Sequence, residues 1–130
     1  MTAQATLKQL AAKVRLTFKY GETALDWDKQ DDWQQKANGY RCTLTYKGRR
    51  YTFDFWQGVG IRHDPTAEGC LECLLSDANV EEDFHDFCSE FGYDEDSRKA
   101  EATHKACLKV GREMRRLLGD DFDTFLLADR

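Results

Sequence analysis

The sequence predicts an α+β domain: an N-terminal helix and a three-stranded antiparallel sheet, followed by three to four helices packed on one face of the sheet. Two observations predict it. Apolar residues alternate with polar ones over 13–20 and in two runs between 40 and 56, and they recur at helical spacing from residue 67 onward. Strands followed by helices are typical of α+β proteins. The 130 residues are therefore expected to form a single domain, with the helix and sheet in 1–60 and the helical part in 64–130.

The first half of the chain is expected to hold one helix and the sheet. Ala-rich Thr2–Ala12 favours a helix, and the alternation over Lys13–Tyr20 favours a strand, whereas the polar segment 22–39 is expected to be a loop. Two further alternating runs flank Lys47-Gly48 and predict a β-hairpin, because glycine supplies the positive φ that such a turn requires. The apolar face of the hairpin comprises Tyr40, Cys42, Leu44, Tyr46, Tyr51, Phe53 and Phe55.

Three helices are expected after the hairpin. Asp64-Pro65 has the residue types of an N-cap and a first helical position, and Asn79 with Glu82 has the spacing of a capping box. The third helix is expected from Asp96-Ser97 to about Leu118, with a further turn or two beyond Gly119. The helical core stripes comprise Ala67, Leu71, Leu74, Leu75 and Ala78; Val80, Phe84, Phe87, Cys88 and Phe91; and Ala100, His104, Cys107, Leu108, Gly111, Met114 and Leu118. The hairpin aromatics are expected to pack against Leu74, Phe84, Phe87 and Leu108.

Composition favours a globular, cytoplasmic protein. Hydrophobic residues make up 41% of the chain, and no apolar run approaches the ~18 residues that span a bilayer. The segment MTAQATLKQL lacks the apolar stretch of a secretory signal. Without export, the five cysteines are expected to be reduced thiols in the core. No contact with a membrane is expected.

Three Cys and His pairs have a spacing of three residues, namely Cys70/Cys73, His85/Cys88 and His104/Cys107. Zinc takes four such ligands in tetrahedral geometry, and Cys70, Cys73, His85 and Cys88 are the expected ligands if a site is present. However, zinc-binding Cys-x2-Cys pairs usually lie on tight turns, whereas this pair falls inside a predicted helix. We therefore expect no metal and no other cofactor, with a small zinc-binding module as an alternative.

No pattern typical of catalysis is found, so the protein is not expected to be an enzyme. A cysteine nucleophile needs a histidine within hydrogen-bond reach and a group that orients it. His85 and His104 each lie three residues from a cysteine, but no orienting residue accompanies them. Gln57–Gly60 lacks the lysine of a phosphate-binding loop, and Asp94–Asp96 lacks the glycine and distal glutamate of a calcium loop.

Charge is segregated along the chain. From His63 to Ser97 there are twelve Asp and Glu residues and no Lys or Arg, whereas the helix that follows is basic. A row of carboxylates on helices can imitate the phosphates of DNA and occupy a basic channel of a nucleic-acid-binding protein. The residues expected to bind such a partner are Glu68, Glu72, Asp83, Asp86, Glu90, Asp94 and Glu95.

A second charge pattern favours the alternative of a nucleic-acid-binding module. Basic residues lie on the third helix and at the hairpin tip, and Trp56 could stack on a base. The basic residues are Lys105, Lys109, Arg112, Arg115, Arg116, Lys47, Arg49 and Arg50. The acidic pI of about 5.2 opposes this alternative, so direct binding of nucleic acid is not expected.

Four segments, TFDF, PTAE, CLLSDA and FCSEFGYDEDSRKAE, resemble those of a group of small bacteriophage and prophage proteins without assigned chemistry. The resemblance covers roughly Tyr40–Val110. It implies a phage protein that acts in the cytoplasm of the host cell, where accessory proteins of this size often inhibit host defences. Together with the acidic helices, it predicts non-catalytic inhibition of a host nucleic-acid-targeting defence protein, of the anti-CRISPR or antirestriction type.

Overall fold

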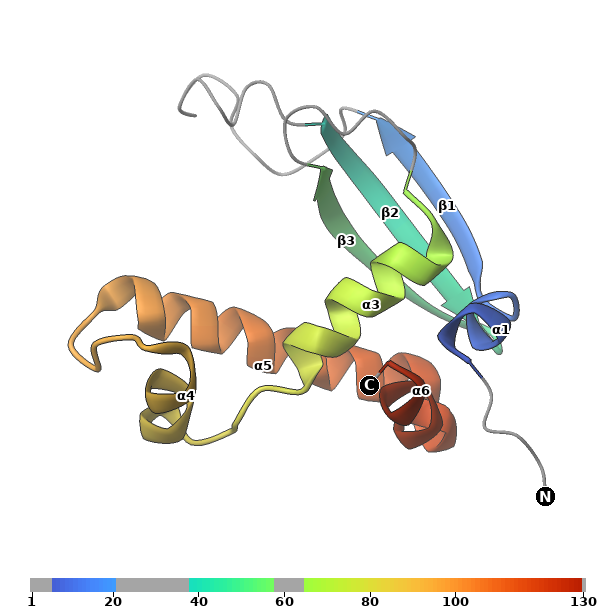
Figure 1. Ribbon diagram of the computed structural model, residues 1–130. Helices are drawn as coiled ribbons and strands as arrows, with labels where there is room; N and C mark the ends of the chain where they lie inside the picture. The colour runs from blue at the N-terminus through green and yellow to red at the C-terminus, as the bar shows by residue number, and fades with distance from the viewer. Residues whose placement is uncertain (1–5, 21–37, 58–64, 130) are drawn as a thin grey trace.

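The computed structural model describes residues 6–20, 38–57 and 65–129, and it confirms the predicted α+β fold. A three-stranded antiparallel sheet lies beside a layer of helices (Figure 1). In chain order the elements are α1 (Leu7–Ala11), β1 (Arg15–Tyr20), β2 (Asn38–Tyr46), β3 (Arg49–Gln57), α3 (Ala67–Ala78), α4 (Phe84–Phe91), α5 (Arg98–Leu118), the 3-10 turn η2 (Gly119–Asp121) and α6 (Phe122–Ala128).

The N-terminal helix begins later than predicted. The Thr6 hydroxyl accepts a hydrogen bond from the Gln9 backbone N–H at 3.2 Å, and the Gln9 side chain accepts one from the Thr6 N–H at 2.9 Å. This capping box leaves Thr6 extended, so the helix begins at Leu7 rather than at Thr2. Residues 1–5 lie outside the described residues.

The predicted hairpin is confirmed. Lys47 and Gly48 have φ values of 47° and 80°, which are the positive values of a type I′ turn, and this turn matches the twist of the paired strands. Leu44 pairs with Tyr51 in the register of β2 and β3, and β1 pairs with the other edge of β2. Strand β2 begins at Asn38, inside the segment predicted to be a loop, while residues 21–37 lie outside the described part of the chain.

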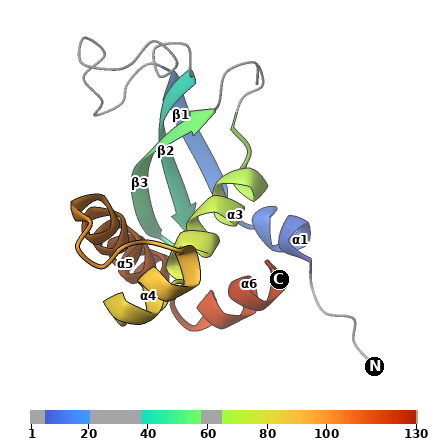
Figure 2. The ribbon, with the colours of Figure 1, turned by 60° about the vertical axis from the view of Figure 1, so that its left-hand side comes forward.

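The main core lies between the sheet and helices α1, α3, α5 and α6, and Figure 2 shows α3 against one face of the sheet. Leu44, Leu71 and Phe125 are completely buried there. The other buried residues of this core are Leu7, Leu10, Ala11, Val14, Tyr46, Leu74, Leu75, Ala78, Met114, Leu117, Leu118 and Phe122. The apolar face predicted for the hairpin is therefore the face that the helices cover.

Burial along β1 is confined to the start of the strand. Val14 and Leu16 contact the main core, but Phe18 and Tyr20 are 40% and 64% exposed, because the core helices pack at the other end of the strand. The Phe18 and Tyr20 rings instead contact Tyr40 edge-on, at centroid distances of 5.6 Å and 5.3 Å.

Helix α3 begins later than predicted. Its N-cap is Thr66, whose hydroxyl accepts a hydrogen bond from the Gly69 N–H at 3.0 Å, so Pro65 precedes the cap instead of opening the helix. Asp64, the predicted cap, lies outside the described residues. The predicted stripe is confirmed, and it also includes Cys70, which is fully buried beside Cys42 of β2.

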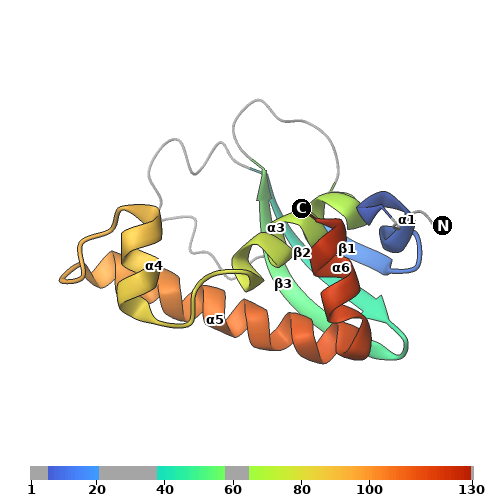
Figure 3. The same ribbon diagram turned by 60° about the horizontal axis from the view of Figure 1, so that its bottom comes forward.

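Helix α4 differs most from its prediction. It begins at Phe84 with Asp83 as N-cap, whereas Asn79 ends α3. Phe84 and Phe87 do not reach the sheet, because Val80–Asp83 carries the chain beyond the end of α3 and lays α4 across α5 (Figure 3). There, Phe87 forms a second, smaller core with Cys88 and Ala100. Phe91, expected to be buried, is 51% exposed.

Helix α5 has the predicted bounds, and Ser97 is its N-cap. Leu117, absent from the predicted seam, is fully buried, whereas Cys107 and Leu108 are only half-buried. Gly119 ends the helix with φ 56° and ψ −128°, a conformation that favours glycine, and a Cβ there would lie 3.0 Å from the Arg49 guanidinium. The predicted final turns form η2 and α6.

The C-terminal helix is held to the hairpin tip. Asp121 accepts hydrogen bonds from the Tyr46 hydroxyl at 2.7 Å and from the Lys47 ammonium at 2.8 Å. These two donors hold the pKa of Asp121 below its usual value, because both stabilise the ionised carboxylate. Phe125, one helical turn further on, lies edge-on against Tyr46 at 5.4 Å.

Candidate protein interface

An acidic arm is formed by α4 and the segments on either side of it, residues 81–96, which Figure 3 shows at one end of the molecule, over the first half of α5. Its eight carboxylates are all exposed, and the chain carries no Lys or Arg from residue 65 to residue 97. The carboxylates belong to Glu81, Glu82, Asp83, Asp86, Glu90, Asp94, Glu95 and Asp96.

Local hydrogen bonds give the acidic arm its shape. The Asp83 carboxylate accepts a hydrogen bond from the Asp86 N–H at 3.0 Å and caps α4, and the Asp94 carboxylate accepts one from the Asp96 N–H at 3.0 Å in the turn before α5. Gly92 ends α4 in the left-handed conformation. Asp83 and Asp94 therefore have structural roles. The two carboxylates within α4 itself, Asp86 and Glu90, cap neither a helix nor a turn.

His104 attaches the acidic arm to α5. Its Nε2 atom donates a hydrogen bond to the Glu81 carbonyl at 2.9 Å, and its ring packs against Phe84 and Phe87 at 5.5 Å and 4.7 Å. The side chain is only 6% exposed. The sequence placed His104 in the core seam, but its role in positioning the arm depends on a backbone carbonyl that no sequence motif marks.

His85 is the histidine of the acidic arm, and its side chain is exposed. Its Nδ1 atom contacts the Glu95 carboxylate, which joins α4 to the turn before α5. This contact raises the pKa of His85, because the carboxylate stabilises the protonated ring.

The raised pKa gives a pH-dependent prediction. The contact stabilises the arm fully below the pKa of an unfolded histidine, and its contribution is lost as the pH rises through the higher pKa of the folded protein. NMR titration should therefore give His85 a pKa above the usual value of about 6.5. Glu95→Gln should lower it and leave the resonances of His104 in place. An unchanged His85 pKa in this variant would contradict the pairing.

The arm also carries apolar surface. Phe91 is 51% exposed, with its ring 5.0 Å from that of Phe87, and the carboxylates of Asp86 and Glu90 lie on the same short helix. A hollow of about 440 Å³ is lined by Glu81, Asp86, Ser89 and Glu90. An exposed aromatic ring among charged side chains is a common feature of protein-binding surfaces.

The seven predicted partner-binding residues do not form one surface. Asp83, Asp86, Glu90, Asp94 and Glu95 lie together on the acidic arm, whereas Glu68 and Glu72 lie on α3. Glu68 is half-buried in the first turn of that helix. Glu72 faces the C-terminal helix, where its charge adds to the effect of burial in raising the pKa of Asp129. The two groups are separated because α4 packs on α5 and not beside α3, and the role of all seven residues in binding a partner stays a prediction.

The four candidate zinc ligands lie in different surroundings. Cys70 is buried against Cys42, Cys73 is exposed, His85 contacts Glu95, and Cys88 is buried beside Phe87. Within the described residues, no three His, Cys, Asp or Glu side chains come together as metal ligands. The absence of a cofactor stays a prediction.

All five thiols have a pKa above the usual value, chiefly because burial disfavours the thiolate. The effect is largest for Cys70, whose pKa is raised to about 12 with a further contribution from Cys42. Protonated thiols are weak nucleophiles at neutral pH. Cys42, Cys70 and Cys88 pack as small buried side chains, whereas Cys73 is exposed and Cys107 is half-buried.

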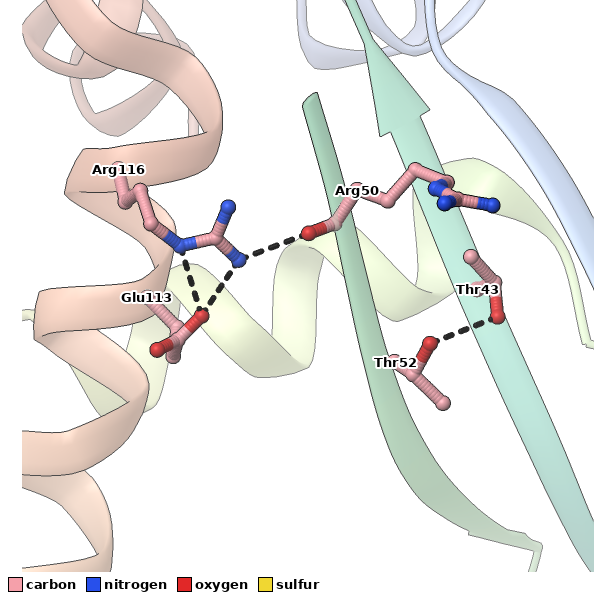
Figure 4. A network of polar contacts seen from close by, with 5 residues as sticks. All are labelled: Thr43, Arg50, Thr52, Glu113 and Arg116. Carbon is pink, nitrogen blue, oxygen red and sulfur yellow. Dashed lines mark hydrogen bonds and ion pairs between the residues drawn. The ribbon is translucent and has the colours of Figure 1, made fainter. Parts of the chain in front are cut away.

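Most basic residues of the alternative surface have contacts within the chain. On α5, Lys105 pairs with Glu101 at 3.0 Å, and Arg115 lies over the Phe122 ring at 4.9 Å. Arg116 pairs with Glu113 at 2.6 Å and donates to the Arg50 carbonyl at 2.7 Å (Figure 4). At the hairpin tip, Lys47 pairs with Asp121 and the Arg49 guanidinium packs against Gly119. The side chain of Trp56 lies outside the described part of the structure.

Comparisons of this chain with protein-family models, with curated proteins and with solved structures find no match. Among the described residues, no helix is long and apolar enough to cross a membrane.

Proposed function

We propose that this is a non-catalytic phage-type protein that binds and inhibits a host nucleic-acid-targeting defence protein through its acidic arm. The proposal places the protein in the host cytoplasm, without a cofactor, as an inhibitor of the anti-CRISPR or antirestriction type. One observation carries it: eight exposed carboxylates and the exposed ring of Phe91 share one short arm that contains no Lys or Arg.

Electrostatics explains why such an arm would select a nucleic-acid-binding protein. A channel that binds phosphates is lined by Lys and Arg, and an acidic surface is attracted to it over distances of about 10 Å at 0.1 M salt. Two of the carboxylates, Asp83 and Asp94, accept hydrogen bonds from the backbone, and these bonds preset the shape of the arm before binding. The Phe91 ring adds apolar contact area, which charge pairing alone does not provide.

The resemblance to small phage proteins favours a defence protein over other basic partners. A phage gains from blocking host proteins that cut or silence its nucleic acid, and such proteins expose basic channels to bind their targets. The acidic arm is complementary in charge to such a basic channel. Basic residues of α5 instead contact residues of the same chain, so they do not favour an acidic partner.

The test reverses charge on the arm without disturbing its caps. Asp86→Lys/Glu90→Lys changes two exposed residues of α4, and Glu72→Lys/Asp120→Lys makes the same charge change elsewhere on the surface. Each tagged variant is expressed in the host, and proteins captured from nuclease-treated lysate are identified and quantified. Phage plating on a host with an active defence system measures inhibition.

We expect the arm variant to lose capture of a nucleic-acid-binding defence protein and to lose protection of the phage, while the control variant keeps both. Capture by the wild type should also weaken as salt rises. Full capture and protection by the arm variant, with circular dichroism showing both variants folded, would contradict the proposal. Nuclease treatment removes any partner that is held only through nucleic acid.

A further inference from the structure

The face of the sheet that turns away from α3 is a basic surface. Its side chains come from alternate positions of all three strands, and the strand register arranges them in three rows: Arg15, Thr45 and Arg50; Thr17, Thr43 and Thr52; and Lys19, Arg41 and Asp54. The hydroxyls of Thr43 and Thr52 lie 3.0 Å apart, which places their side chains on the same face (Figure 4). We call these nine residues the open face.

The open face is accessible and predominantly positive. None of its nine side chains is buried, and its four cations, Arg15, Lys19, Arg41 and Arg50, are all exposed. Asp54 is its single acid, and it pairs with Arg41 at 3.3 Å. This concentration of positive charge contrasts with the net charge of −5 of the whole chain.

Arg15 and Arg50 stand out within the open face. They occupy the same row, on either side of Thr45, and among the described residues no carboxylate lies within ion-pair distance of either guanidinium. Two exposed arginines in one row without an acidic partner leave positive charge that a bound anion would neutralise. By contrast, Arg41 on the same face pairs with Asp54, and Arg116 on α5 pairs with Glu113.

From this geometry we propose that the open face binds the phosphate backbone of single-stranded nucleic acid. Guanidinium groups pair with phosphates in a planar, bidentate geometry, and threonine hydroxyls are further donors to phosphate oxygens. Successive rows of the open face are two residues apart, about 6.6 Å along each β-strand. An extended nucleic-acid strand that runs along the sheet can therefore place a phosphate at each row.

The open face is made of sheet strands and carries no helix, which favours a single strand over a duplex. Duplex recognition generally inserts a helix or a β-ribbon into a groove, whereas exposed sheet faces commonly hold single strands. The described side chains of this face are arginines, a lysine, threonines and one aspartate, and the basic and hydroxyl groups among them suit contacts to the phosphates of the backbone. This inference departs from the expectation, based on the acidic pI, that the chain does not touch nucleic acid.

The inference does not depend on the proposed function. The acidic arm and the open face belong to different elements, one at the first half of α5 and the other on the sheet (Figures 1 and 3). A protein that carries both would contact the basic protein of a nucleoprotein complex with the arm and its single-stranded nucleic acid with the sheet.

The test is fluorescence anisotropy with a labelled single-stranded oligonucleotide of mixed sequence, between about 50 and 200 mM salt. Arg15→Gln/Arg50→Gln removes the two unpaired cations and keeps long polar side chains. Each phosphate contact to a single strand contributes about −0.7 to the slope of log K against log salt, so the slope of this variant should be shallower by about 1.4. Lys99→Gln/Arg112→Gln removes the same charge from exposed positions of α5 and should leave the slope unchanged.

The proposal would be overturned by no binding of the wild type at the lowest salt, by an equal loss of affinity in both variants, or by preference for the matching duplex. Displacement of the oligonucleotide by poly-glutamate as effectively as by polyphosphate would also overturn it, since that would make the surface a site for any polyanion, including an acidic protein. Circular dichroism verifies that both variants fold. The arm variant Asp86→Lys/Glu90→Lys should bind at least as well as the wild type, so the two proposals fail separately.

Discussion

Phe125→Ala should lower the free energy of unfolding by about 3–5 kcal/mol, as expected for truncation of a large, fully buried ring. Phe125 is completely buried, and it joins α6 to the hairpin through its edge-on contact with Tyr46. Domains of this size are typically stable by only about 5–15 kcal/mol, so the variant should lose a large part of its stability. Denaturant titration followed by circular dichroism measures the change.

Leu127→Ala is the matched control for this prediction. It also removes a large apolar side chain from the same helix, but Leu127 is 52% exposed. Its effect should stay within about 0.5 kcal/mol, as for most surface substitutions. Equal effects of the two substitutions would show that α6 does not pack through Phe125.

Phe87→Ala should detach the acidic arm and leave the sheet folded. The Phe87 ring is 2% exposed and is the centre of the smaller core, within 4.7–5.7 Å of the rings of Phe91, Tyr93 and His104. This core is separate from the main one, so its loss opens α4 locally and does not unfold the whole domain. Truncation of a buried phenylalanine ordinarily lowers stability by about 3–5 kcal/mol. A short helix with few other contacts should not stay packed on α5 after such a loss.

Hydrogen exchange measured by mass spectrometry distinguishes local opening from global unfolding. Peptides that cover α4 should lose protection in Phe87→Ala, while peptides that cover β2 and α3 should keep it. Partner capture through the arm should be lost with the helix. Phe91→Ala, which truncates an exposed ring of the same helix, should retain the protection of α4 and weaken only capture. Uniform loss of protection in Phe87→Ala would show that the two cores unfold together.

Local sequence signals predicted the fold correctly where a residue type is closely tied to one backbone conformation or one capping hydrogen bond. The Lys47-Gly48 turn and the start of α5 near Ser97 were both predicted, because positive φ and capping hydrogen bonds depend on residues adjacent in sequence. The starts of α3 and α4 were placed wrongly because several residues that can cap lie close together. The chain uses Thr66 and Asp83, and the tertiary packing of each helix decides between such candidates.

The candidate surfaces were likewise predictable only in part. The acidic segment and its exposure were predictable, since charge and hydrophobic period are read directly from the residues. That Glu72 lies apart from Asp86 was not predictable, because it depends on α4 crossing onto α5. The role of His104 was also hidden, since its partner is a backbone carbonyl 23 residues away.

The sequence by itself determined the α+β class, the hairpin and its turn, the helix that follows Ser97 and the sign of charge on each segment, because these follow from period, caps and composition. Only the tertiary structure decided which charges act together. Arg15 and Arg50 are 35 positions apart in sequence and become one pair through the registers of β1 with β2 and of β2 with β3. Register and helix packing are set by burial of the whole core, which no local pattern specifies.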